Sequence, residues 1–273
     1  MLTKPGIIVG NLITMLAGFA LGSHGPLNFP LLFSSILGLS CIIASACIFN
    51  NAIDRNIDAK MTRTKTRAIA SGAISLPRGV LLGSTLGLLG SFILAIFVNP
   101  LSLTAALFGF TVYVAAYTLL KPKSHHATLI GSIAGAIPPI VGYTASANTL
   151  NLEAYVLFLI VVFWQMPHFF AIAIYRLDDY AAASIPVLPL SKGLKATKIQ
   201  MALYTLAFFL SSLCPFFLGM AGSIYLAIAT LVGFYWLCLT VQGFWMANDT
   251  LWAKRIFRAS LVAITAISLA III

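Results

Sequence analysis

Hydrophobic residues along this chain gather into nine long runs separated by shorter polar stretches. Each run is 18 to 21 residues long, which is about the length that an α-helix needs to cross the hydrocarbon core of a bilayer. Glycine, proline and charged residues cluster between the runs, as they do in loops at a membrane surface. The pattern predicts nine transmembrane helices, at residues 6–23, 30–49, 79–98, 101–119, 128–147, 154–174, 199–219, 222–242 and 256–273.

The composition supports this reading of the pattern. Of the 273 residues, 60% are hydrophobic and only 8% are charged, and the mean hydropathy is +1.02. A soluble domain of this length needs far more polar surface to cover its core. The sequence therefore predicts an all-α, polytopic membrane protein with the lipid bilayer as its surroundings.

Beyond the first run, the basic residues occur only in every second gap between the runs or at its edge. One of the 16 lysines and arginines precedes the first run, and the second, fourth and sixth gaps hold six, two and four. The last three, Lys254, Arg255 and Arg258, lie in the eighth gap or in the first turn after it. Because basic residues collect in cytoplasmic loops, the N-terminus is expected in the cytoplasm and the C-terminus outside. The net charge of +10 is explained by this orientation, and we expect no nucleic-acid partner.

The few acidic residues are concentrated after the second run, in the stretch NNAIDRNIDAKMTRTKTR (50–67). The whole chain holds six acidic residues, and Asp54 and Asp58 are two of them. On a helix, Asn50, Asp54 and Asp58 share one face, with neighbouring side chains about 6 Å apart. Two carboxylates at this spacing repel each other unless a cation lies between them. Oxygen ligands with room left for phosphate oxygens suit Mg²⁺.

Basic residues follow the acidic motif and add anion-binding capacity beside it. They are Arg63, Lys65 and Arg67. Together the two groups predict a site for a magnesium-bound diphosphate at the membrane surface. The alternative is that these are solvated loop charges that obey the positive-inside rule. That rule explains the cations, but it leaves the spaced acids in so acid-poor a chain unexplained.

A second polar loop, YRLDDYAAASIPVLPLSKG (175–193), also begins with a polar cluster and then becomes basic. Its cluster contains Tyr175, Asp178 and Asp179. Adjacent residues on a helix point about 100° apart. At most one of the two aspartates is therefore expected to face a shared site. The other is expected to cap the helix or to meet Arg176.

The motif N-x-x-x-D-x-x-x-D after the second run resembles the intramembrane prenyltransferase superfamily, which includes 4-hydroxybenzoate polyprenyltransferase. Four further stretches resemble its protoheme IX farnesyltransferase branch. They are KPGIIVGNLITMLAGF (4–19), GSIAGAIPPIVGY (131–143), FWQMPHFFAIAIYRLDDY (163–180) and IPVLPLSKG (185–193). The resemblance extends over most of the chain.

The resemblance implies one domain (1–273) of nine helices around a central cavity, in a bacterial inner membrane. It implies transfer of the farnesyl group of farnesyl diphosphate to a vinyl group of haem b, with Mg²⁺ as cofactor and haem O as product. The catalytic, metal-binding residues would be Asn50, Asp54, Asp58 and Asp179, with Asp178 as a further metal ligand. The family's second motif, D-x-x-x-D, has Tyr175 at its first position here, so that the second half of the metal site departs from the pattern.

Haem contacts are expected from polar residues elsewhere in the chain. His168, in WQMPHFF, falls inside the sixth run, and a histidine within a membrane is costly and usually functional. A structural hydrogen bond beside Pro167 is the alternative. The other haem candidates are Trp164, Lys121, Lys123, His125, His126 and Asn11.

Two other functions compete with this prediction. A sister prenyltransferase would act on an aromatic quinone precursor. A membrane transporter would place ionisable groups near the middle of the bilayer, whereas nearly all the charge here is expected at one surface. A haem A synthase or a terminal oxidase is a further candidate partner of the farnesyltransferase.

Overall fold

The computed structural model describes residues 2–23 and 25–272, and every regular element in these two ranges is helical. The elements are α1 (Pro5–Gly22), α2 (Phe29–Ile53), α3 (Arg55–Asp58), α4 (Leu76–Phe97), α5 (Pro100–Thr111), the π-helix η1 (Val112–Tyr117), α6 (Thr118–Leu120), α7 (Ala127–Gly135), α8 (Ile137–Ala147), α9 (Leu152–Tyr175), α10 (Leu177–Ala182), α11 (Leu188–Ser191), α12 (Gly193–Phe217), α13 (Ser223–Gln242) and α14 (Asp249–Ile272).

In the described residues, nine helical segments are long and apolar enough to cross a membrane, and each overlaps a predicted run. The prediction of an all-α protein with nine spans is confirmed, whereas the central cavity stays a prediction. Residue 273, the predicted end of the last span, lies outside the described residues. Two spans begin six or more residues earlier than predicted, α12 at Gly193 and α14 at Asp249, because their first turns are polar and continue the helix beyond the apolar run.

Two of the spans are not regular α-helices. The span from Pro100 to Leu120 contains η1, and π-helical turns inside longer helices occur frequently at functional sites. The span from Ala127 to Ala147 is interrupted at Ala136. Two prolines, Pro138 and Pro139, open α8 there, and a proline ring cannot continue the hydrogen-bond pattern of the preceding helix.

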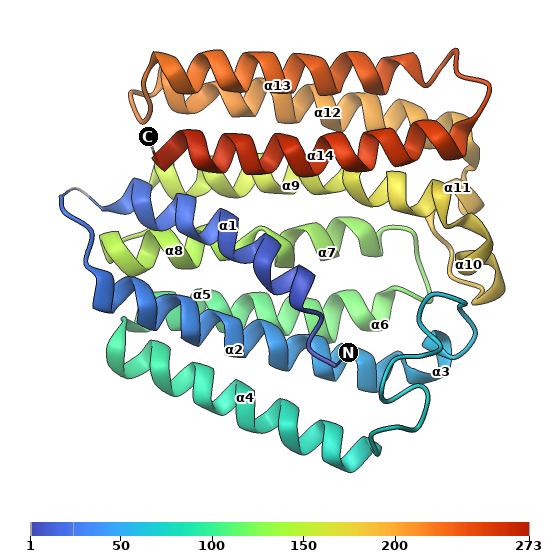
Figure 1. The fold of residues 1–273 in the computed structure, drawn as a ribbon, viewed down its shortest axis with the longest axis horizontal. Coiled ribbons are helices and arrows are strands. Elements are labelled where there is room, and N and C mark those ends of the chain that lie inside the picture. Colours follow the sequence, from blue (N-terminus) through green and yellow to red (C-terminus); the bar gives the residue numbers. More distant parts are fainter. Residues whose placement is uncertain (1, 24, 273) are drawn as a thin grey trace.

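The spans lie side by side, with α4 and α13 at opposite margins, while α1 crosses in front of α8 (Figure 1). Close approach of α1 and α8 depends on glycine. A Cβ atom at Gly18 would overlap the carbonyl of Pro139, and one at Gly142 would overlap the carbonyl of Met15. Small residues at such crossings let membrane helices pack backbone to backbone.

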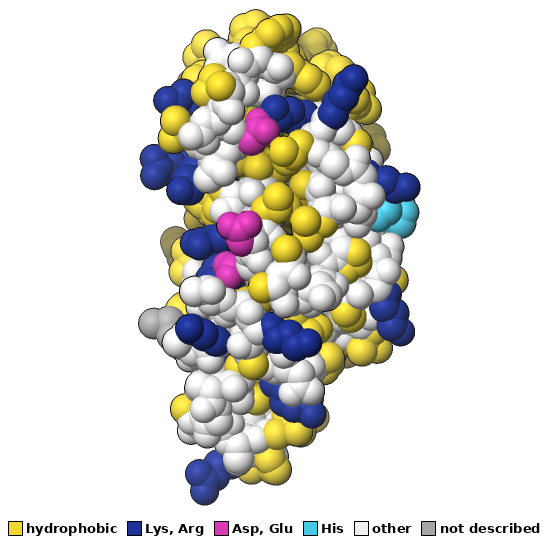
Figure 2. Space-filling view, turned by 90° about the vertical axis from the view of Figure 1, so that its right-hand side faces the viewer, with side chains coloured by type: hydrophobic (Ala, Val, Ile, Leu, Met, Phe, Trp, Pro, Cys, Tyr) yellow, Lys and Arg dark blue, Asp and Glu magenta, His cyan; other side chains and the backbone are white. Residues whose placement is uncertain are grey.

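The charged loops gather at one end of the bundle. The short helices α3, α10 and α11 lie together there, at the right of Figure 1. Figure 2 faces this end and shows Lys and Arg side chains around acidic and apolar ones. The sides of the bundle are apolar, with Leu88, Phe217 and Leu231 more than 70% exposed. This distribution suits a protein whose sides contact lipid and whose end contacts water.

Candidate functional site

The acidic motif lies where α2 passes into α3. The backbone N–H of Asp54 donates to the carbonyl of Asn50 (2.9 Å), and that of Asp58 donates to the carbonyl of Asp54 (2.8 Å). The chain therefore stays helical across the junction, and the three side chains share one face as predicted. All three are at most 2% exposed. Buried charges at this depth need partners, because their desolvation is costly.

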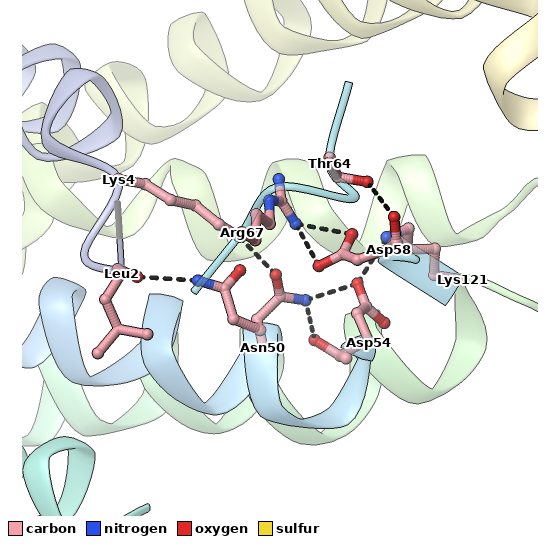
Figure 3. A network of polar contacts seen from close by, with 10 residues as sticks. Leu2, Lys4, Asn50, Asp54, Asp58, Thr64, Arg67 and Lys121 are labelled. Carbon is pink, nitrogen blue, oxygen red and sulfur yellow. Dashed lines mark hydrogen bonds and ion pairs between the residues drawn. The ribbon is translucent and has the colours of Figure 1, made fainter. Parts of the chain in front are cut away.

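Both carboxylates of the motif are paired with cations from other segments (Figure 3). The Nζ atom of Lys121 lies 2.6 Å from Oδ2 of Asp54. One guanidinium nitrogen of Arg67 donates to both carboxylate oxygens of Asp58, at 2.7 and 2.8 Å. Lys121 follows α6 directly, and Arg67 lies in the loop after α3. These ion pairs therefore hold the segment after α6 and the loop after α3 against the C-terminal end of α2.

Asn50 is the centre of a second set of contacts. Its amide group donates to Asp54 Oδ2 (3.1 Å) and to Thr118 Oγ1 (3.0 Å), and its Oδ1 accepts from Lys4 Nζ (2.6 Å). Burial lowers the pKa of Lys4 to about 8, and the positive charge of Arg67 acts in the same direction. Sequence reasoning missed Lys4 and Thr118 as site residues, although Lys4 is the lone cation before the first span.

One carboxylate oxygen of the motif lacks a partner. Asp54 Oδ1 is buried and accepts no hydrogen bond from the described residues, which is an unfavourable state for a charged group. Among these residues no cluster of three or more His, Cys, Asp or Glu side chains is close enough to hold a metal ion. Two carboxylates and an amide oxygen nevertheless fit Mg²⁺, which commonly keeps coordination positions for substrate phosphates.

The second predicted loop reaches the first through one aspartate. Asp179 Oδ1 accepts from the backbone N–H of Thr62 (2.9 Å), which joins α10 to the loop after α3. Asp178 is exposed, and the prediction that at most one of the pair faces a shared site stays a prediction. Arg63 and Lys65 are also exposed, so that both remain accessible to an anion at this surface.

His168 lies against α14. Its Nδ1 atom is 2.7 Å from the hydroxyl of Ser260, and its ring stacks on Trp164 with 4.8 Å between the ring centroids. The indole N–H of Trp164 donates to the backbone carbonyl of Ser260 (2.7 Å). The structure therefore brings two of the predicted haem candidates together around a single serine.

The remaining haem candidates do not form one cluster. Lys121 forms an ion pair with Asp54 of the acidic motif, while Lys123 is exposed. The rings of His125 and His126 lie 4.2 Å apart just before α7. Burial, together with the neighbouring His126, lowers the pKa of His125, which favours its neutral form. The side chain of Asn11 donates to a carbonyl one turn earlier in its own helix.

These features define a class: an intramembrane protein with a buried, cation-lined acidic face at one surface, suited to a metal-bound anion. The model of the UbiA prenyltransferase family matches residues 11–262. The chain belongs to the UbiA prenyltransferase family, as its sequence predicts.

Two relatives show the branch within the family. A protoheme IX farnesyltransferase of Protochlamydia amoebophila is 49% identical over 99% of this chain and 96% of its own length. Protoheme IX farnesyltransferase 2 of Pseudomonas putida is 47% identical over 98% of this chain and 91% of its own. The predicted resemblance to this branch is confirmed.

A solved structure shares the fold. It is a UbiA homologue from Archaeoglobus fulgidus bound to DMAPP and Mg²⁺, with a TM-score of 0.76 and 16% sequence identity. The match covers 99% of this chain and 97% of that one.

Proposed function

We propose that this protein transfers the farnesyl group of farnesyl diphosphate to a vinyl group of haem b, giving haem O and diphosphate. The observation that carries the proposal is the buried face of Asn50, Asp54 and Asp58 with its three cations. Its family and the names of its relatives support the chemistry. The bound DMAPP and Mg²⁺ of the archaeal homologue support a prenyl diphosphate and a divalent metal as ligands.

The acidic face would bind the diphosphate through Mg²⁺, and the surrounding cations would bind its phosphate oxygens directly. Asn50, Asp54, Asp58 and Asp179 would hold Mg²⁺, with Asp178 less well placed because it is exposed. Bound Mg²⁺ would supply positive charge to the departing diphosphate. The chain's own cations add to that charge and position the phosphate oxygens. These cations are Lys4, Arg63, Lys65, Arg67 and Lys121.

The reaction needs no protein nucleophile. The bond between the allylic carbon and the diphosphate oxygen breaks, and both electrons leave with the diphosphate. The vinyl carbon of haem then forms a carbon–carbon bond to the farnesyl cation. Water adds to the carbon next to the porphyrin ring, and a proton is released. The apolar walls of the bundle keep water from the farnesyl cation until the vinyl group attacks.

We assign haem recognition first to His168. Ser260 holds the Nδ1 atom of this ring, and histidines that bind metals usually have their other nitrogen held in this way. Trp164 supplies a flat apolar surface beside it. Lys123, His125 and His126 are assigned to the propionate side of haem, where the neutral His125 contributes hydrogen bonding and Lys123 the charge. Asn11 is assigned as a further haem contact, whereas Lys121, which pairs with Asp54, is assigned to the diphosphate.

The protein is assigned to the bacterial inner membrane, with its charged end and N-terminus in the cytoplasm. Segregation of the 16 basic residues to the loops and helix ends of one side supports this orientation. Farnesyl diphosphate would then reach the site from the cytoplasm, and haem from the lipid. A haem A synthase or a terminal oxidase is the expected recipient of the product.

Expression of the chain, extraction of membrane haems and mass spectrometry test the proposal. Haem O is expected with the wild-type chain and not with Asp54→Ala. A prenylated quinone precursor in place of haem O would favour the sister prenyltransferase. Absence of any prenylated product from a folded chain would favour the transporter.

A further inference from the structure

A groove of about 430 Å³ lies on the outer surface between α13 and α14. Its apolar floor includes Leu231 and Val262, and its polar lining consists of Tyr235, Arg255 and Arg258. The two helices pack side by side (Figure 1). Both arginines are exposed, and the groove is separate from the residues assigned to farnesyl transfer.

The groove lies at the depth of the lipid chains. The 20 residues of α13 cover about 30 Å, the thickness of the hydrocarbon core. Leu231 lies near the middle of this helix, and Tyr235 lies seven residues, about 10 Å, before its last residue. Arg255 and Arg258 line the same groove, so that their long side chains start below the membrane surface and must reach toward it.

The arginines have no acidic partner within the protein. In the part of the chain that the structure describes, neither guanidinium forms an ion pair or a side-chain hydrogen bond, and α13 contains no charged residue. An arginine inside a membrane normally pairs with another group. The missing partner is therefore expected to be an anion supplied by the surroundings.

We propose that this groove binds an anionic phospholipid. Guanidinium groups match phosphate oxygens through paired hydrogen bonds, and the hydroxyl of Tyr235 adds a further donor. The apolar floor beyond them fits an acyl chain. One phospholipid thus matches both the basic rim and the apolar floor of the groove, and it would contact α13 and α14 together. The proposal does not rest on farnesyl transfer.

Native mass spectrometry of the purified full chain with phosphatidylglycerol or phosphatidylcholine tests this. The wild-type chain is expected to retain phosphatidylglycerol preferentially. In the double variant Arg255→Gln/Arg258→Gln that preference should fall about twenty-five-fold, about fivefold for each cation. Lys254→Gln is the matched control, because this exposed neighbour on α14 does not line the groove. Its preference should equal that of the wild type.

Equal retention of the two lipids by the wild type, or equal loss in the control variant, would overturn the proposal. So would displacement of phosphatidylglycerol by haem b at the same arginines, which would assign the groove to propionates. A photoreactive phosphatidylglycerol on the wild-type chain gives a second test that no misfolded variant can obscure. Cross-links on α13 and α14 are expected, and an even distribution over all spans would contradict the site.

Discussion

Replacing Asp54 by asparagine separates the charge of the acidic face from its packing. The side chain keeps its size in a position with no exposed surface. Its Oδ2 accepts from Lys121 (2.6 Å) and Asn50 (3.1 Å), and its Oδ1 has no partner in the described chain. An amide oxygen at Oδ2 can keep both contacts. Lys121 nevertheless loses its counter-ion in a largely buried position, so the change should cost about 2 kcal/mol of stability.

The expected effect of Asp54→Asn on turnover is far larger. Loss of one carboxylate from a metal–diphosphate site removes several kcal/mol of charge stabilisation. A loss of about 4 kcal/mol slows the reaction roughly a thousandfold. Initial rates of haem O formation at saturating substrates measure this effect, and thermal unfolding in the same detergent measures the stability.

Asp249→Asn supplies the control for that experiment. Asp249 pairs with Lys198 at 2.5 Å and is more exposed than Asp54, so that the same chemical change should cost no more stability and leave turnover near the wild-type rate. If Asp54→Asn retains turnover within tenfold of the wild type, the assignment of Asp54 is wrong. Unfolding of the variant that accounts for the lost activity would also refute the reasoning.

Three further predictions concern topology, metal and haem. A cysteine introduced at Lys65 or Lys123 should react only with a reagent on the cytoplasmic side, and labelling from outside would refute the orientation. Chelation of the metal should stop turnover of the wild type, and added Mg²⁺ should restore it. Asp58→Ala should fold but stay inactive with Mg²⁺ present, because it removes a metal ligand. Turnover of the wild type without the metal would contradict the metal assignment. His168→Ala should raise the haem requirement and abolish any haem-dependent Soret shift while diphosphate affinity stays unchanged; equal damage to both substrates would remove the haem role.

The positions of the spans could be predicted because hydropathy reports contact with lipid directly. It does not report helix ends, and α12 therefore begins six residues before the predicted start at 199. The π-helix η1 and the break at Ala136 also lie within apolar runs. Hydropathy does not depend on whether the backbone is α-helical, π-helical or interrupted, so it cannot reveal either irregularity. Only the break at Ala136 has a sequence signal, the two prolines Pro138 and Pro139 that follow it.

The acidic face could be predicted because its three members are neighbours on one helix. Its partners come from distant segments: Lys4, Lys121 and Thr118 meet the motif across 46, 67 and 68 residues. Only packing of α1 and η1 against α2 brings them there. Lys121 was expected near haem propionates because its basic loop also contains histidines, and the sequence held no indication of its contact with Asp54.

Incubation of the purified chain with farnesyl diphosphate, haem b and Mg²⁺, followed by mass spectrometry of the haem, tests the proposed reaction most directly. The account predicts haem O carrying one farnesyl group and one added water, formed only when Mg²⁺ is present. Unchanged haem b from a folded chain that prenylates an aromatic quinone precursor under the same conditions would contradict it.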